Sequence, residues 1–215
     1  MPGARQEQID DLMEQASEAL AATSYIDAEL LADRALHLAH RARDYDRMAR
    51  ICLPLQEARR QRLMQAADAD HGRPRTVDQP FDDRFPQESG LYLVQPMLVA
   101  ADARRLRTQA LEHRVPAVVL CREPLTSVGL QPVVAIGDLV IRTKVRPPRN
   151  ARQPDRTWFL EALEQLGDAA IDEIDAALTP LRRVDALLER LDAVVDHEKL
   201  HQRLAEACRD AASGE

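Results

Sequence analysis

The stretch LYLVQPMLV at residues 91–99 is apolar at most positions, and a second such stretch, VPAVVLC, follows at residues 115–121. Strands that are apolar on both faces must be covered on both faces, which is typical of the inner strands of a parallel sheet. Between the two stretches, residues 103–114 have the composition of a helix, with Asp102 as its N-cap. The sequence therefore predicts a β-α-β crossover whose helix covers one face of the sheet, while another segment covers the other face.

Two further strands follow the crossover. The segments PVVAI (132–136) and LVIRTKV (139–145) flank Gly137-Asp138, a pair suited to a two-residue type II′ hairpin turn. In the second segment apolar residues alternate with charged ones, so we expect a half-exposed strand at or near an edge. The sequence thus predicts a small β-α-β-β-β sheet within residues 90–149.

After the sheet, the spacing of apolar residues returns to the helical period. Thr179-Pro180 is a typical N-cap and first residue of a helix, and the register of that helix slips near Asp196, where we expect a break. We expect the C-terminal helices, residues 150–215, to form a hairpin or triplet that packs on the open face of the sheet.

The N-terminal region, residues 1–71, also has helical periodicity. One helix carries small and apolar residues in the pattern Y-x2-A-x3-A-x2-A-L-x-L, namely Tyr25, Ala28, Ala32, Ala35, Leu36 and Leu38. This pattern resembles the second helix of a tetratricopeptide repeat, in which small residues let two helices pack closely. The resemblance implies a helical hairpin or triplet. About three repeats normally bury such a layer, so it needs cover from the rest of the chain, a second copy or another protein.

Two details of this region carry expectations of their own. Pro54 lacks an amide proton, so a helix that starts near Asp44 should kink or restart there. The basic residues Arg59, Arg60 and Arg62 are expected on a solvated helix face.

Residues 72–89, GRPRTVDQPFDDRFPQES, separate the helices from the sheet. They contain three prolines and no periodicity, so we predict a linker or an extended arm. Phe81 and Phe85 lie here, and we expect them to hold the arm against a neighbouring surface. The predicted fold is α+β and mainly helical. Its four regions are residues 1–71, 72–89, 90–149 and 150–215.

Composition and charge exclude several classes of protein. The 215 residues are 45% hydrophobic and 30% charged, which excludes a collagen-like or wholly disordered chain. The first fifteen residues carry four acids and no apolar signal core, and no stretch could cross a membrane, so we expect a cytoplasmic protein without a membrane partner. Residues 150–215 hold fifteen Asp/Glu and eight Lys/Arg, a net charge of −7, which disfavours nucleic-acid binding because the acids repel phosphate.

One string has a catalytic pattern. His197-Glu198-Lys199-Leu200-His201 fits HExxH, which on a helix places two imidazoles on one face for zinc and a glutamate beside the bound water. The pattern is similar to that of the zincin metalloproteases. Its neighbours are polar and no third ligand can be picked downstream, so we favour a solvated helix start over a metal site at His197 and His201.

A second candidate site follows from topology. Both strands of a parallel β-α-β unit end at the same edge, so Asp102 and the turn of Cys121, Arg122 and Glu123 should converge there. A cysteine beside an arginine could act as a thiolate. No histidine is predicted nearby as a base, and Asp102 disfavours a thiolate, so a buried structural cysteine is the favoured interpretation.

A basic run forms the third candidate. It contains Arg142, Lys144, Arg146, Arg149, Arg152 and Arg156 against one acid, Asp155. Charged residues on an edge strand prevent association between sheets, and this is the interpretation we favour. The alternatives are an acidic protein or the acidic ends of this chain, and nucleic acid. No aromatic residue interleaves the run, which disfavours base stacking.

We expect a scaffold or adaptor for protein-protein interaction, with a protein partner or self-association and no cofactor. This expectation rests on the short alanine-rich helical layer and on an edge strand that could accept a strand from a partner. The alternatives are an enzyme or a small-ligand sensor that uses the strand-end residues near Asp102 and Cys121, and a zinc site at His197, Glu198 and His201.

Overall fold

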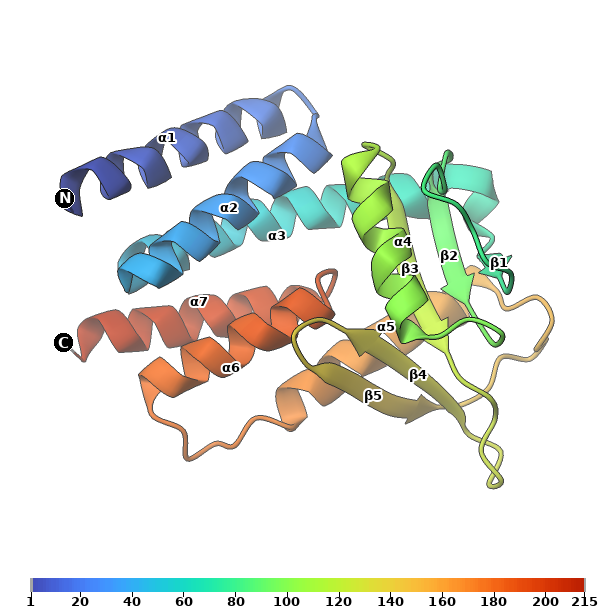
Figure 1. Ribbon diagram of the computed structural model, residues 1–215. Helices are drawn as coiled ribbons and strands as arrows, with labels where there is room; N and C mark the ends of the chain where they lie inside the picture. The colour runs from blue at the N-terminus through green and yellow to red at the C-terminus, as the bar shows by residue number, and fades with distance from the viewer. Residues whose placement is uncertain (1, 215) are drawn as a thin grey trace. The chain divides into compact units, whose positions relative to one another are not determined.

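The computed structural model describes residues 2–214, which form two compact units (Figure 1). The first unit is helical and the second contains a sheet. Of the described residues, the first comprises 2–61, 174–188 and 198–214, and the second comprises 62–173 and 189–197. The described residues hold seven α-helices and a five-stranded mixed sheet, which confirms the α+β, mainly helical fold. The C-terminal region, expected as one region, contributes to both units.

The sheet has the strand order β1-β2-β3-β4-β5. Its strands are β1 (Arg75–Val77), β2 (Gly90–Val94), β3 (Ala117–Arg122), β4 (Gln131–Ile136) and β5 (Val140–Val145). β1, β2 and β3 are parallel, while β4 is antiparallel to both β3 and β5. The strand β1 was not predicted, because three residues within a proline-rich segment are too short to show a period of two. The expected hairpin and the edge position of β5 are both present. The predicted two-residue type II′ turn is wrong, because three residues, 137–139, connect β4 to β5 and Gly137 does not have a positive φ.

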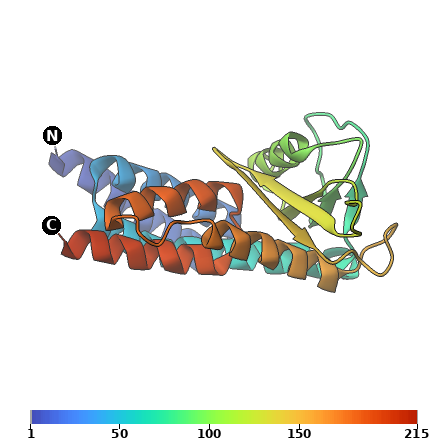
Figure 2. The same cartoon turned by 90° about the horizontal axis from the view of Figure 1, so that it is seen from below.

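Helices cover both faces of the sheet within the second unit (Figure 2). Helix α4 (Ala100–Glu112) packs Leu106 into a core with Tyr92 and Val94 of β2. Helix α5 (Arg156–Asp172) packs against β4 and β5, and its Phe159 is completely buried. Cover of this face therefore comes from the single helix α5 and not from the expected C-terminal hairpin or triplet, since the last helix belongs to the helical unit.

Helix α4 starts three residues earlier than predicted. Val99, not Asp102, occupies the N-cap position. Asp102 lies three residues further on, where its carboxylate accepts a hydrogen bond from the backbone N–H of Val99 at 2.9 Å. The carboxylate still stabilises the first turn, because it satisfies a backbone donor at the positive end of the helix.

The arm between β1 and β2 is fixed by aromatic contacts. Phe81 and Phe85 have ring centroids 5.3 Å apart, and Phe85 meets the edge of Tyr92 at 5.5 Å. Both phenylalanines pack against the core beneath α4, as expected for a pinned arm. The guanidinium of Arg105 lies over the Phe81 ring at 5.1 Å and adds a cation–π contact.

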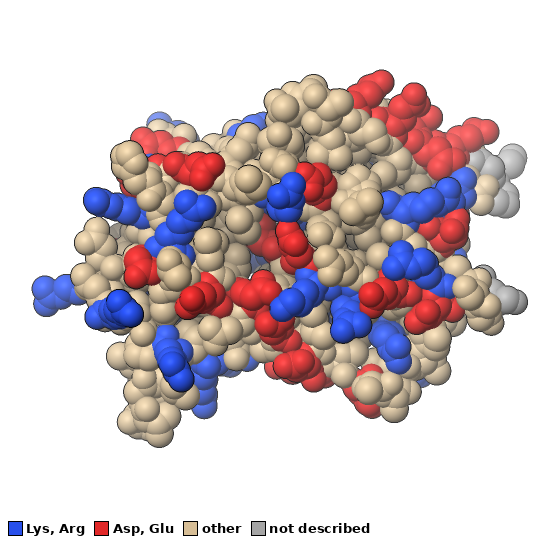
Figure 3. Space-filling model, turned by 180° about the vertical axis from the view of Figure 1, so that it is seen from behind, with Lys and Arg blue, Asp and Glu red and all other residues tan. Residues whose placement is uncertain are grey.

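The helical unit contains α1, α2, α7 and parts of α3 and α6. Their bounds are α1 (Pro2–Ala21), α2 (Tyr25–Ala42), α3 (Tyr45–Asp68), α6 (Pro180–Ala193) and α7 (Glu198–Ser213). Ala28, Ala32 and Ala35 of α2 are buried, as the spacing of small residues predicted. Hydrogen bonds join α2 to α6, through His40 and Asp185, and to α3, through Glu29 and Arg59. Acidic side chains gather over α1 (Figure 3).

Two expectations about α3 are wrong. The helix continues through Pro54, so the expectation that it restarts there is wrong. Burial of the adjacent Cys52 and Leu55 offsets the roughly 3 kcal/mol that a proline costs inside a helix. Arg59 and Arg62 are buried instead of solvated, because each lies against carboxylates of its own unit. Among residues 2–214, no helix combines the length and apolar character needed to cross a membrane.

Candidate functional site

The HEKLH segment is not a continuous helical face. Helix α7 begins at Glu198, so His197 lies in the connection before it. The rule that residues four apart share a face applies only within one helix. His197 and His201 are both buried, and each has contacts of its own.

His201 belongs to a buried ionic network in the helical unit. Its Nε2 lies 3.2 Å from Nη1 of Arg59. A guanidinium only donates hydrogen bonds, so Nε2 of His201 accepts and carries no proton. Arg59 also donates to Oε1 of Glu29 at 3.0 Å and to Oδ1 of Asp33 at 2.9 Å. The lone pair on Nε2 of His201 is therefore occupied by the hydrogen bond from Arg59.

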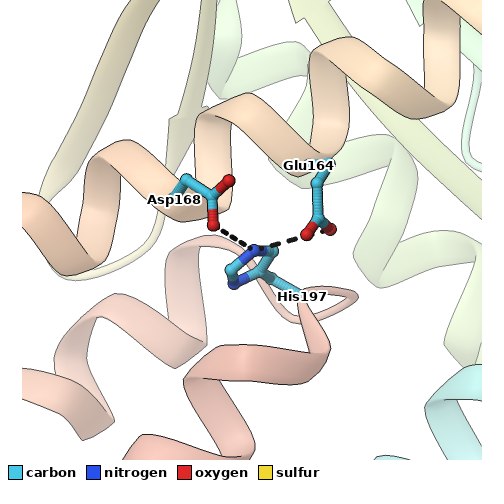
Figure 4. A group of neighbouring side chains, drawn as sticks. All are labelled: Glu164, Asp168 and His197. Carbon is cyan, nitrogen blue, oxygen red and sulfur yellow. Dashed lines mark ion pairs between the residues drawn. The ribbon is translucent and has the colours of Figure 1, made fainter.

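His197 lies between two carboxylates in the sheet unit (Figure 4). Its Nε2 is 3.5 Å from Oε2 of Glu164 and 3.4 Å from Oδ1 of Asp168. The two acids are one turn apart on α5, so both point from the helix toward the same ring. One ligand atom from each of the three residues lies within 4.8 Å of the other two. The arrangement suits a proton or a cation between an imidazole and two carboxylates.

A glycine of α5 makes room for this ring. A Cβ atom added to Gly167 would lie 2.1 Å from Cγ of His197, far inside van der Waals contact. The imidazole thus lies directly against the helix backbone, where its side chain is fully buried. Glycine lowers helix stability by about 1 kcal/mol relative to alanine. Its presence inside α5 is explained by the space that it leaves for the His197 ring.

The strand-end residues do converge, and each has a defined contact. Asp102 and Glu123 lie close enough to Cys121 to act on its thiol electrostatically. Burial, followed by the charges of these two acids, raises the pKa of Cys121 to about 12. Nε of Arg122 donates to Oε1 of Gln95 at 3.1 Å, and the guanidinium also donates to the carbonyl of Ala151. This environment keeps the thiol protonated, which disfavours nucleophilic chemistry at Cys121.

The predicted basic run follows β5 and the segment after it. Arg142, Lys144, Arg146 and Arg149 are all exposed. Arg142 forms a two-pronged ion pair with Glu123 of the strand-end site, at 3.0 and 2.7 Å. The basic run and the strand-end site therefore meet at this pair.

A pocket of about 290 Å³ lies at the end of β5. It is lined by Arg146, Trp158, Glu161, Ala162 and Gln165. The indole N–H of Trp158 donates to the carbonyl of Arg146 at 2.8 Å, which fixes the aromatic wall of the pocket to the strand. The pocket combines the indole of Trp158 and the methyl group of Ala162 with polar side chains, and it lies beside a charged strand.

Sequence reasoning singled out His197 but not its two acidic neighbours. Glu164 and Asp168 have the spacing of one helical turn, and Gly167 interrupts a helix that is otherwise free of glycine. Those two signals together could have marked this face of α5. The pairing with His197 depends on how the chain returns after α6, which no local pattern encodes. No family model matches this chain, and no curated protein or solved structure matches it either.

Proposed function

We propose that this protein is an adaptor whose strand β5 takes up an acidic, extended segment of a partner protein as a further strand. The observation that carries the proposal is the position of β5 at the edge of the sheet, together with the direction of its backbone groups. An edge strand presents unpaired N–H and C=O groups along one side, and these can pair with a segment of another chain.

The register identifies which groups point outward. The carbonyl of Pro132 in β4 accepts from the N–H of Glu123, so the backbone of Pro132 faces β3. Because direction alternates along a strand, the neighbouring Val133 faces β5, where its partner is Thr143. Thr143 therefore points inward, and the outward groups of β5 belong to the alternate residues, which are Val140, Arg142 and Lys144.

Charge and shape favour an acidic segment with an apolar anchor. The side chains of Arg142 and Lys144 flank the edge, and those of Arg146 and Arg149 continue the positive charge beyond it. The pocket beside Trp158 would take one apolar side chain of the bound strand. The chain's own acids gather over α1, but a helix has no unpaired backbone groups along its side, so the occupant is assigned to another protein.

The experiment uses the full chain and a fluorescent heptapeptide of alternating Glu and Val. The peptide should bind, and the amides of Val140, Arg142 and Lys144 should then exchange more slowly with solvent. Two further peptides carry N-methyl groups at the odd or at the even positions. One of them should lose binding and the other should retain it, because only one set of N–H groups faces β5. Equal binding by both methylated peptides, or unchanged exchange of the three amides, would contradict strand addition.

Matched variants separate charge from backbone pairing. Lys144→Glu should weaken peptide binding and reduce its dependence on salt. Arg152→Glu, an exposed substitution of the same kind outside the strand, is the control and should change the affinity much less. If the two variants weaken binding equally, the attraction is a general effect of net charge and the assignment to the β5 edge is wrong.

A further inference from the structure

The cluster on α5 provides an inference that is independent of the adaptor proposal. We propose that Glu164, Asp168 and His197 bind a divalent first-row transition metal, with Zn²⁺ as the best match. The three residues lie in one unit, and Figure 4 shows both carboxylates directed at the same imidazole.

The distances match those between ligands of a tetrahedral zinc ion. Zinc bonds to imidazole nitrogen and carboxylate oxygen are about 2.0–2.1 Å, which places tetrahedral ligands roughly 3.3–3.4 Å apart. Nε2 of His197 lies 3.5 Å from Glu164 and 3.4 Å from Asp168. Both separations exceed the usual 2.7–2.9 Å of a charged hydrogen bond. The two carboxylate oxygens lie within 4.8 Å of each other, so an ion bound by all three atoms would require the carboxylates to move only modestly.

The site is largely formed before any ion binds. The two acids are held at one-turn spacing by α5, and the ring of His197 is held against Gly167. A fixed donor set avoids part of the entropy that ordering ligands would cost. This pre-organisation distinguishes the cluster from a chance gathering of acids on a surface.

The donor chemistry selects the class of metal. Imidazole nitrogen suits zinc, copper, nickel and iron, whereas magnesium and calcium prefer all-oxygen sites. Two carboxylates supply the charge that neutralises a divalent ion. Glu164 and Asp168 are 51% and 43% exposed, so a fourth position would face solvent and hold water. Three protein ligands with one open position is the pattern of an accessible metal site.

Zinc uptake is measured by competition with a chromophoric chelator on the metal-free full chain. One equivalent should bind. Asp168→Asn and Glu164→Gln, which preserve shape, should each weaken binding by at least about tenfold. Glu161→Gln, on the same helix and outside the cluster, is the matched control and should leave binding unchanged. Unfolding temperatures without metal show whether each variant is folded.

Cobalt gives a second readout that reports geometry. Co²⁺ in the intact site should give the intense visible absorption of a four-coordinate ion, and Asp168→Asn should remove it. Ca²⁺ or Mg²⁺ at the same concentration should not compete. The proposal fails if the intact chain takes up no zinc, in which case His197 is an ion-paired histidine. It also fails if the two carboxylate variants bind zinc as well as Glu161→Gln does.

Discussion

His197 and His201 are four residues apart and both are buried, yet their surroundings are opposite in charge. His197 lies against two carboxylates of α5, whereas His201 lies against the guanidinium of Arg59. Carboxylates favour a proton or a metal ion on the ring, and an arginine requires a lone pair. The same motif thus contains one histidine suited to a cation and one that accepts a hydrogen bond. Spacing alone does not define a metal site, because the partners decide what each ring can hold.

The largest expected effect tests the His201 side of this comparison. Arg59→Leu removes the cation that faces His201 and leaves Glu29, which is 2% exposed, as a buried charge without its ion-pair partner. The free energy of unfolding should fall by about 3–5 kcal/mol, as measured by urea denaturation. Arg60→Leu, an adjacent exposed arginine, should leave the denaturation midpoint nearly unchanged. Equal effects of the two variants would show that the network around His201 does not hold the helices together.

The next effect tests the His197 side. Gly167→Ala places a methyl group where the His197 ring lies, so the ring must leave its seat. We expect a loss of about 1–3 kcal/mol in the free energy of unfolding, despite the higher helix propensity of alanine. Zinc binding should be lost as well. Glu161→Ala, an exposed change on the same helix, should have neither effect, and retention of zinc binding by Gly167→Ala would exclude the proposed seat.

The smallest effect concerns a third histidine, His37, which lies beside the carboxylate of Asp33. Its side chain is partly exposed, whereas His197 and His201 are buried. A hydrogen bond to Asp33 raises the pKa of His37. Burial opposes ionisation of Asp33, but the hydrogen bond from His37 and the charge of Arg59 give a net lowering of its pKa. Because the pKa of His37 is higher in the folded state than in the unfolded state, its protonation stabilises the fold at pH below about 6.5. This stabilisation is lost as the pH rises through the pKa of His37 in the folded state.

The free energy of unfolding of the His37→Gln variant should therefore be a few tenths of a kcal/mol lower than that of the natural chain at pH 5.5. At pH 8.5 the two values should be almost equal. The effect is small because the His37 and Asp33 side chains are 45% and 37% exposed. Urea denaturation at the two pH values measures it. A difference of the same size at both pH values would mean that the ring contributes by packing and not by charge.

Much of the fold was predictable because hydrophobic period is a local signal. The strands around Leu93 and Leu120 and the helices on either side of the sheet all follow from it. The strand β1 was missed because three residues carry too little pattern. The burial of Arg59 and Arg62 was missed because an arginine run has the same composition whether its partner is water or a distant carboxylate.

The proximity of candidate residues was predictable where they are neighbours in sequence or where a β-α-β unit joins them. The basic run is one short segment and the convergence of Asp102 with Cys121 follows from topology, while the function of both groups stays a prediction. The α5 cluster joins residues more than 25 positions apart, with a whole helix between them. Its local signs were the one-turn spacing of Glu164 and Asp168 and the presence of Gly167, whose role becomes clear only when the position of the His197 ring is known.

The path of the chain through the two units has a consequence for synthesis on the ribosome. The helical unit begins with α1 and is completed only by α7, so its first helices leave the exit tunnel long before their cover exists. Two of the crossings between units, after Gln61 and after Leu188, fall inside continuous helices. Neither half can be released by cutting at a flexible joint. The nascent N-terminal helices must therefore stay soluble until α7 has been synthesised, and gene fragments that lack α7 should yield aggregation-prone products.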